Sequence, residues 1–220
     1  IQHLVAGAAW TGQSERFGDV YNPAMGKVHA RVALASSADV DHVVAVARGA
    51  QPAWGATPPA KRAQVMFAFR DLLNRHDNEL AEMISREHGK TVPDAMGELQ
   101  RGFEVVEFAC GIPHLLKGEY SDGVAAGVDS FSIRQPVGVV AGITPFNFPA
   151  MVPMWMYPMA IACGNTFVLK PSEKDPTAPL LCARLLSEAG LPDGVFNLVN
   201  GDKEAVDTLL TDERVQAVSF

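Results

Sequence analysis

Two polar residues, Thr144 and Asn147, supply a hydroxyl and an amide inside a long uncharged stretch of the chain. No charged residue lies between Arg134 and Lys170. Five prolines and three glycines interrupt this stretch, which excludes a membrane-spanning helix, because lipid cannot replace the backbone donors that proline removes. The stretch is therefore expected in the core of an α/β sheet. Polar groups at the end of a buried strand are typical of a small-molecule site.

A second set of chemically active groups follows the next apolar block, in the segment Lys170-Pro171-Ser172-Glu173. In doubly wound sheets, an acidic residue just past the second strand holds the ribose hydroxyls of adenosine. Glu173 stands at about this position, and its charge would repel the additional phosphate of NADP. Lys170 could donate to the same ribose. The alternative is an ordinary charged strand exit at the protein surface.

The turn between these blocks does not carry the glycine fingerprint G-x-G-x-x-G that usually binds a dinucleotide. It reads instead Gly142-Ile143-Thr144-Pro145-Phe146-Asn147-Phe148-Pro149. The prolines would hold the turn rigid, so that backbone groups near Thr144 and Phe146 could approach a flat ligand. The alternative is a proline-rich buried turn in which Asn147 caps the following helix. Spacing alone leaves both interpretations open.

The elements that must position these groups alternate between strand and helix. This rhythm implies right-handed crossovers and a doubly wound, Rossmann-like parallel sheet in an α/β fold. The predicted strands are Val137–Ile143, Thr166–Lys170, Val195–Val199 and Val215–Phe220, and the helices between them are Ala150–Cys163, Pro176–Ala189 and Lys203–Leu210. Because the last strand would leave an apolar sheet edge, we expect a part of a longer protein.

The N-terminal half is predicted to be mainly helical after about thirty residues of short strands and turns. A long amphipathic segment opens at Thr57-Pro58-Pro59, breaks near His76-Asp77 and stops at Gly89. Other predicted helices are Val40–Ala50, capped by Ser36 or Ser37 and ended by Pro52, and Asp94–Lys117. Residues 128–134 alternate as a hairpin strand would. We therefore divide the chain into residues 1–118 (strands and helices), 119–135 (a projecting oligomerisation hairpin) and 136–220 (the incomplete dinucleotide-binding core).

Composition narrows the class of function. The chain has 220 residues, 48% of them hydrophobic, and a net charge of −7 with a pI near 5.3. An acidic protein without a basic cluster is not expected to bind nucleic acid. The three cysteines are widely spaced, so they predict neither a disulfide framework nor a metal site. The reducing cytoplasm is therefore the expected compartment, and no secretion signal is visible at the N-terminus.

Several segments resemble the aldehyde dehydrogenase superfamily. These are GITPFNFP, GNTFVLKPSE and GLPDGVFNLVNG, together with VYNPAMGKV and REHGKTVPDAMGE in the first half. The resemblance covers essentially the whole chain. Within the superfamily, FACGIPHLLKGE at residues 108–119, Phe146 and the helix WMYPMA resemble the CoA-acylating methylmalonate-semialdehyde dehydrogenase branch. Many hydrolytic relatives carry Trp at the position of Phe146.

The resemblance implies a role for individual residues. Asn147 matches the side-chain amide of the oxyanion hole, which stabilises a hemithioacetal oxygen. In the family, a cysteine thiolate attacks the aldehyde, hydride passes to NAD, and a thioacyl enzyme forms. In this branch the thioacyl intermediate loses carbon dioxide. Coenzyme A then accepts the remaining acyl group, which gives propanoyl-CoA. The positions that match NAD contacts are Thr144, Phe146, Lys170, Glu173 and Lys174.

The resemblance also implies what the 220 residues lack. The family nucleophile lies well beyond residue 220, and none of Cys110, Cys163 and Cys182 occupies its position. Each of the three stands in a helix pattern among Ala, Leu or Ile, which is typical of a small buried core residue. We therefore expect these 220 residues alone to be inactive. The histidines have no metal-ligand spacing, so no metal site is predicted.

Two alternatives to an acylating semialdehyde dehydrogenase remain. One is a hydrolytic aldehyde dehydrogenase of another substrate class, which would form no thioester with coenzyme A. The other is a non-catalytic NAD-binding or oligomerisation module. The resemblance further implies a homotetramer, in which the segment Glu119–Gln135 pairs with another subunit.

Overall fold

The computed structural model describes residues 1–220. Its strands are β1 (His3–Val5), β2 (Ala8–Trp10), β3 (Phe17–Asn22), β4 (Lys27–Ala33), β5 (Tyr120–Ala125), β6 (Val128–Phe131), β7 (Val139–Ile143), β8 (Thr166–Lys170), β9 (Phe196–Leu198) and β10 (Val215–Ser219). Its helices are α1 (Ser37–Ala56), α2 (Pro59–Arg75), α3 (Asp77–His88), α4 (Val92–Cys110), α5 (Ile112–Leu115), α6 (Met151–Met154), α7 (Tyr157–Ala162), α8 (Thr177–Glu188) and α9 (Lys203–Thr211).

A six-stranded sheet in the order β10-β7-β8-β9-β1-β2 forms the centre of the molecule. The four strands predicted from the strand–helix rhythm, β7 to β10, are parallel to one another. The short N-terminal strands β1 and β2 extend the sheet in the antiparallel sense. The predicted α/β fold with a doubly wound parallel sheet is therefore confirmed, with an antiparallel edge added.

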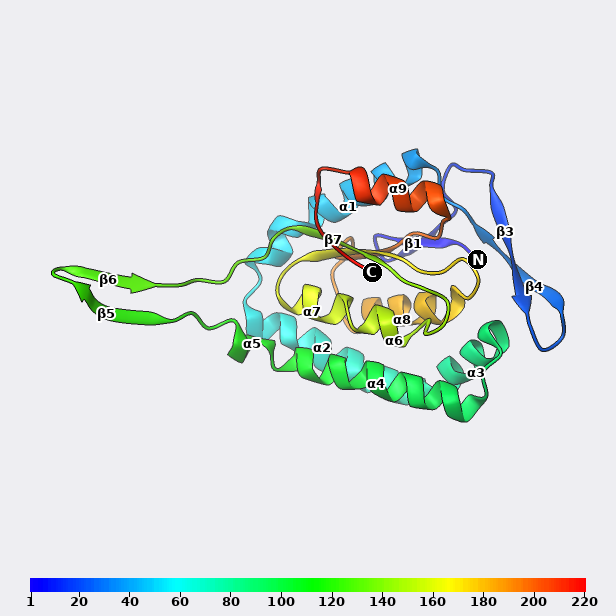
Figure 1. Ribbon diagram of the computed structural model, residues 1–220, viewed down its shortest axis with the longest axis horizontal. Coiled ribbons are helices and arrows are strands. Elements are labelled where there is room, and N and C mark those ends of the chain that lie inside the picture. Colours follow the sequence, from blue (N-terminus) through cyan, green and yellow to red (C-terminus); the bar gives the residue numbers. More distant parts are fainter.

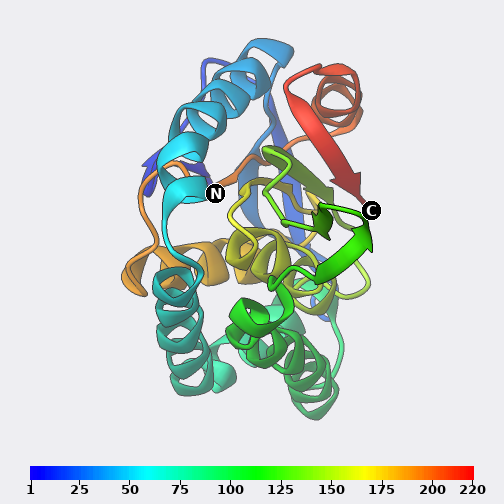
Figure 2. The ribbon, with the colours of Figure 1, turned by 90° about the vertical axis from the view of Figure 1, so that its left-hand side faces the viewer.

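Helices cover both faces of the central sheet (Figure 2), and the side chains of its central strands alternate between the two faces. Val139 and Ala141 of β7 and Val168 of β8 pack in one cluster with α1 and α9. Val140 of β7 and Phe167 of β8 pack in the larger cluster with α2, α4, α7 and α8. A strand that is buried on both faces needs apolar residues at every position, which explains its uninterrupted apolar sequence.

Helix α1 differs from the prediction, because it continues through Pro52 to Ala56. Proline lacks an N–H group, so the helix loses the bond to the carbonyl four residues earlier. The last turn is nevertheless anchored from outside. Trp54 is buried, and its Nε1 donates to the carbonyl of Ile161 over 2.9 Å. The start of the helix follows the prediction, since Ser36 and Asp39 form a reciprocal capping box.

Two other predicted helices are divided in the structure. The segment 150–163 forms α6 and α7, and the segment 94–117 forms α4 and α5. In each case a proline, Pro158 or Pro113, lies in the first turn of the second helix. Its ring clashes with the carbonyl four residues earlier and prevents one continuous helix. The predicted break at residues 76–77 and the left-handed stop at Gly89 (φ 89°) are both confirmed.

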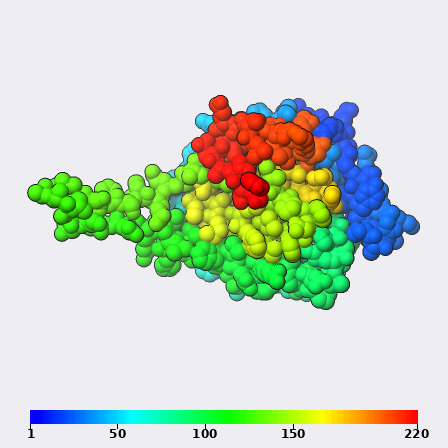
Figure 3. All heavy atoms as spheres, viewed as in Figure 1, coloured from blue at the N-terminus to red at the C-terminus, as the bar shows by residue number.

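Two hairpins stand apart from the central sheet. Strands β3 and β4 form a separate two-stranded sheet whose first strand lies against α3. Strands β5 and β6 pair only with each other, and all their residues are exposed. They project far from the body of the molecule (Figures 1 and 3). None of the helices combines the length and the apolar character that crossing a membrane requires.

Candidate functional site

The two polar segments singled out in the sequence meet at one edge of the sheet. Strands β7 and β8 are parallel neighbours, and Ile143 lies opposite Lys170. The N–H of Thr144 donates to the carbonyl of Lys170 over 3.1 Å. The Thr144 hydroxyl is buried without a hydrogen-bond partner. The carboxyl edge of the sheet therefore offers a free hydroxyl beside the end of β8.

Lys170 and Glu173 form an ion pair just past β8. The Lys170 Nζ lies 3.2 Å from a carboxylate oxygen of Glu173. The lysine side chain is 7% exposed, whereas that of Glu173 is 40% exposed. The Glu173 carboxylate can therefore contact a ligand in solvent, while the buried Lys170 ammonium group holds this carboxylate in place.

The aromatic ring of Phe146 lies beside the side chains of Lys174 and His88. It is 48% exposed, and the Lys174 Nζ lies 4.5 Å from its centroid. The imidazole of His88 stacks on it at 6.3 Å between centroids. Burial, and then the charge of Lys90, lower the pKa of His88. The neutral imidazole is therefore favoured near neutral pH, and Lys174 supplies the cation.

Asn147 lies in the loop between β7 and α6 and is exposed. Its side-chain amide makes no hydrogen bond within the chain, but its backbone carbonyl accepts one from the Lys90 Nζ over 3.0 Å. The amide is therefore available to a ligand, and the backbone that carries it is held in place.

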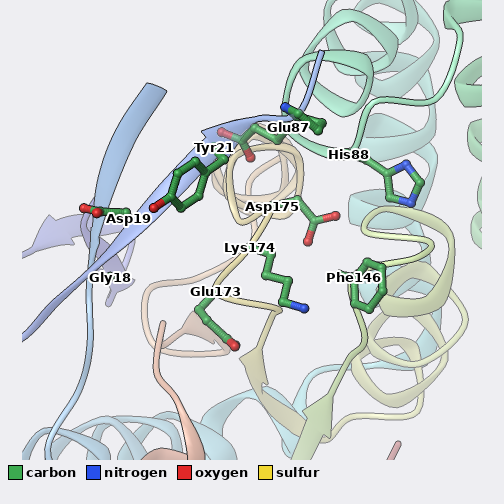
Figure 4. A pocket seen from close by; sticks show the side chains of 10 residues that line it. Gly18, Asp19, Tyr21, Glu87, His88, Phe146, Glu173, Lys174 and Asp175 are labelled. Atoms are coloured by element: carbon green, nitrogen blue, oxygen red, sulfur yellow. The ribbon is translucent and has the colours of Figure 1, made fainter. Parts of the chain in front are cut away.

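A cavity of about 430 Å³ opens at this edge of the sheet. Figure 4 shows that its walls come from the β3–β4 hairpin, the end of α3, the loop after β7 and the segment after β8. Three of the predicted site residues line it, and the β3–β4 hairpin was not expected to take part. The lining residues are Gly18, Asp19, Tyr21, Pro23, Glu87, His88, Phe146, Glu173, Lys174 and Asp175.

Two buried carboxyl groups lie in the wall of this cavity. Asp175 is 2% exposed, and neither carboxylate oxygen has a hydrogen-bond partner. Burial raises the pKa of Asp175 to about 8. Burial also raises the pKa of Glu87, although its carboxylate accepts hydrogen bonds from the N–H and the hydroxyl of Thr177. The wall is therefore less negative near neutral pH than its composition suggests.

A second cavity, of about 380 Å³, is lined in part by Phe148 of the loop that carries Asn147. Sequence reasoning missed two of its residues, Lys90 and Glu98. Lys90 directly follows the helix stop Gly89, and Glu98 adjoins Leu99 on the apolar face of α4. A charged residue next to an apolar stripe is the signal that could have identified Glu98. The cavity is lined by Lys90, Pro93, Asp94, Gly97, Glu98, Arg101 and Phe148.

None of the three cysteines lines either cavity. Cys110 and Cys182 are buried, and Cys163 is half-buried. Burial raises the pKa of all three thiols, that of Cys182 to about 12. No group of three or more histidine, cysteine, aspartate or glutamate side chains is arranged to hold a metal ion.

Comparisons with known proteins agree with this architecture. The chain is 56% identical over all 220 residues to a malonate-semialdehyde dehydrogenase of Pseudomonas aeruginosa, of which it covers 44%. It is 48% identical over its whole length to a mitochondrial methylmalonate-semialdehyde dehydrogenase (acylating) of Arabidopsis thaliana, of which it covers 36%. A crystal structure from Sinorhizobium meliloti, complexed with NAD, superposes on the whole chain with a TM-score of 0.98 and 57% identity.

The chain thus spans less than half the length of these relatives. It corresponds to 45% of the Sinorhizobium meliloti chain. The model of the aldehyde dehydrogenase family matches residues 10–220, which is nearly all of the sequence. On this evidence the chain belongs to the aldehyde dehydrogenase family.

Proposed function

We propose that this chain is part of an NAD-dependent, CoA-acylating dehydrogenase that oxidises methylmalonate semialdehyde and malonate semialdehyde. The products would be propanoyl-CoA and acetyl-CoA, formed with loss of carbon dioxide. One observation carries the proposal: the Thr144–Asn147 loop and the Lys170–Glu173 pair meet at one sheet edge. The relatives named for this activity, one of them as acylating, support the substrate class.

The residues at this edge fit a dinucleotide cofactor. The Thr144 hydroxyl has no hydrogen-bond partner within the chain, and the Glu173 carboxylate is 40% exposed beside the cavity. Glu173 would accept hydrogen bonds from the ribose hydroxyls, and Lys170 would hold that carboxylate in place. Thr144, Phe146 and Lys174 would contribute further contacts. When bound, NAD accepts the hydride that leaves the aldehyde carbon.

Asn147 would act on the substrate itself. Its free amide would donate to the aldehyde oxygen as negative charge develops there. The nucleophile in this proposal is a cysteine thiolate outside these 220 residues. It adds to the carbonyl carbon, the hydride is transferred to the cofactor, and a thioacyl enzyme results. Loss of carbon dioxide leaves a carbanion that takes a proton from solvent, and the CoA thiol then takes the acyl group and releases the cysteine as its thiolate.

The test of the proposed function is dependence on coenzyme A. The complete protein, given methylmalonate semialdehyde and NAD, should form NADH and propanoyl-CoA in equal amounts when CoA is present. A hydrolytic enzyme would form NADH and a free acid at the same rate without CoA. Mass spectrometry of the thioester, together with absorbance at 340 nm, separates these two results. An absence of NADH under both conditions would favour a non-catalytic module instead.

Glu173 is expected to make the complete enzyme prefer NAD over NADP by at least about tenfold in kcat/KM, because its charge repels a 2′-phosphate. Lys170, which pairs with Glu173, reduces that repulsion without removing it. Glu173→Gln should lower the ratio of kcat/KM for NAD to kcat/KM for NADP, mainly by raising kcat/KM for NADP. The matched control is Glu188→Gln at the exposed end of α8. Equal kcat/KM values for the two cofactors in the unmodified enzyme would contradict this role of Glu173.

We further propose that the enzyme is a homotetramer in the cytoplasm. The projecting β5–β6 hairpin supports association, because a two-stranded hairpin alone has little stability. Its exposed Tyr120, Val124, Val128 and Phe131 offer apolar area to another subunit. The three unpaired cysteines are consistent with a reducing compartment.

A further inference from the structure

The ion pair between Lys90 and Glu98, which are distant in sequence from Asn147, binds the loop that carries Asn147. Lys90 lies between α3 and α4, and Glu98 lies in the second turn of α4. Their side chains are 12% and 1% exposed, and the Lys90 Nζ lies 2.6 Å from the Glu98 Oε2. Both charges are therefore largely withdrawn from water and depend on each other and on the groups around them.

Glu98 binds the loop on the side that follows Asn147. Its Oε1 accepts hydrogen bonds from the N–H groups of Ala150, over 2.9 Å, and Met151, over 3.1 Å. These donors begin α6, which has no side-chain cap of its own. A helix start leaves its first N–H groups without partners in the helix, so the carboxylate satisfies donors that would otherwise be buried and unpaired.

Lys90 binds the loop at Asn147 itself. Its Nζ donates to the Asn147 carbonyl over 3.0 Å and lies 4.5 Å from the centroid of the Phe148 ring. The pair therefore fixes the peptide that directly follows Asn147 and, three residues later, the start of α6. The amide side chain of Asn147 makes no hydrogen bond within the chain, so the contacts that fix its backbone are the ones that set where this side chain starts and what its N–H group can reach.

A contribution to stability does not by itself explain this arrangement. Replacing a buried ion pair by apolar residues of similar size is often neutral or stabilising, so such a pair is weak evidence for a stabilising role. The contacts of the pair instead fix the backbone of the loop from which the Asn147 amide extends. An oxyanion donor must lie within hydrogen-bond distance of one position of the substrate oxygen, and a displacement of about 1 Å can cost roughly 10²-fold in rate.

We propose that Lys90 and Glu98 are positioning residues that hold the Asn147 amide in its catalytic orientation. The proposal rests on the proposed function, because it gives Asn147 the role of oxyanion donor. Neither side chain is assigned a contact with substrate or cofactor. Their effect on turnover should therefore pass through Asn147 and disappear when the amide is absent.

The experiment is a double-mutant cycle in the complete enzyme. Lys90→Met keeps the apolar stem over Phe148 and removes the donor to Asn147. We expect kcat to fall by about 10- to 100-fold with Asn147 present, and by less than about threefold in the Asn147→Ala background. KM for NAD should stay unchanged in every variant. Lys90→Arg should restore part of the rate, because it returns a donor to the carbonyl.

Two further variants guard against simple misfolding. Lys90→Met leaves Glu98 as an unpaired buried charge. The double variant Lys90→Met/Glu98→Gln is therefore measured as well, because both of its new side chains are neutral and similar in size to the originals. It should show the same dependence on Asn147 while the melting temperature returns towards that of the unmodified enzyme. Lys203→Met is the control, because it breaks an exposed ion pair with Asp207 on α9. It should leave kcat unchanged in both backgrounds.

The outcomes separate the two hypotheses. If Asn147→Ala alone leaves kcat unchanged, the oxyanion role in the proposed function is wrong. If Asn147→Ala is costly but Lys90→Met lowers kcat by the same factor in both backgrounds, the pair has a general structural role and the positioning proposal is overturned. A fall in kcat on Lys90→Met that occurs only when Asn147 is present supports the positioning proposal.

Discussion

Asn147→Ala in the complete enzyme is expected to lower kcat by about 10²- to 10³-fold, the usual cost of one oxyanion donor, while NAD affinity barely changes. The amide is exposed at the exit of β7 and makes no hydrogen bond within the chain, so its removal should disturb little of the fold. Single-turnover kinetics with the semialdehyde, together with NAD titration, measure the two quantities separately.

The matched variant is Asn147→Asp, which keeps the shape of the side chain and replaces the N–H donor by a carboxylate oxygen. It should be at least as slow as Asn147→Ala, because a negative charge would face the developing oxyanion. If turnover and NAD affinity fall by the same factor in Asn147→Ala, Asn147 supports the structure of the cofactor site instead.

A polypeptide of residues 1–220 is expected to form no NADH from methylmalonate semialdehyde or propanal. The attacking species must be a thiolate, and burial raises the pKa of every thiol in the chain. Cys182, with a pKa of about 12, is essentially never ionised near neutral pH. The Cys110 thiol is buried and donates to the carbonyl of Val106 within its own helix.

Absorbance at 340 nm under NAD saturation measures NADH formation by this polypeptide, with the complete enzyme as the positive control. Cysteine-to-serine changes at positions 110, 163 and 182 decide what any residual activity means. Activity abolished by one of these changes would place the nucleophile within these residues. Activity that survives all three would contradict the cysteine mechanism itself.

The central sheet could be predicted from the sequence because burial on both faces leaves a clear pattern. Strands β7 and β8 are uninterrupted apolar runs that end at polar residues, and their ends meet as parallel strands require. The break at residues 76–77 and the turn at Gly89 were also predictable, since each depends on local conformation. The course of α1 past Pro52 was not, because a distant contact of Trp54 outweighs the local cost.

The site was predictable only where its residues lie close together in sequence. The contribution of the β3–β4 hairpin to the cavity depends on its packing against α3, which no local pattern contains. The hydrogen bonds from the Asn147 loop to Glu98 likewise join residues about fifty positions apart. A long-range contact leaves no periodicity in the sequence, so a single chain cannot reveal it.

The isolation of the β5–β6 hairpin has a consequence for how the protein behaves on dilution. No strand other than its partner pairs with it, and its side chains are exposed in the single chain. If the hairpin pairs with another subunit, as proposed, the free energy that orders it would come largely from that subunit. Mass action then links the order of this hairpin to protein concentration. Diluting the protein would then loosen residues 119–135 first, while the central sheet next to the Asn147 loop keeps its own two-sided core.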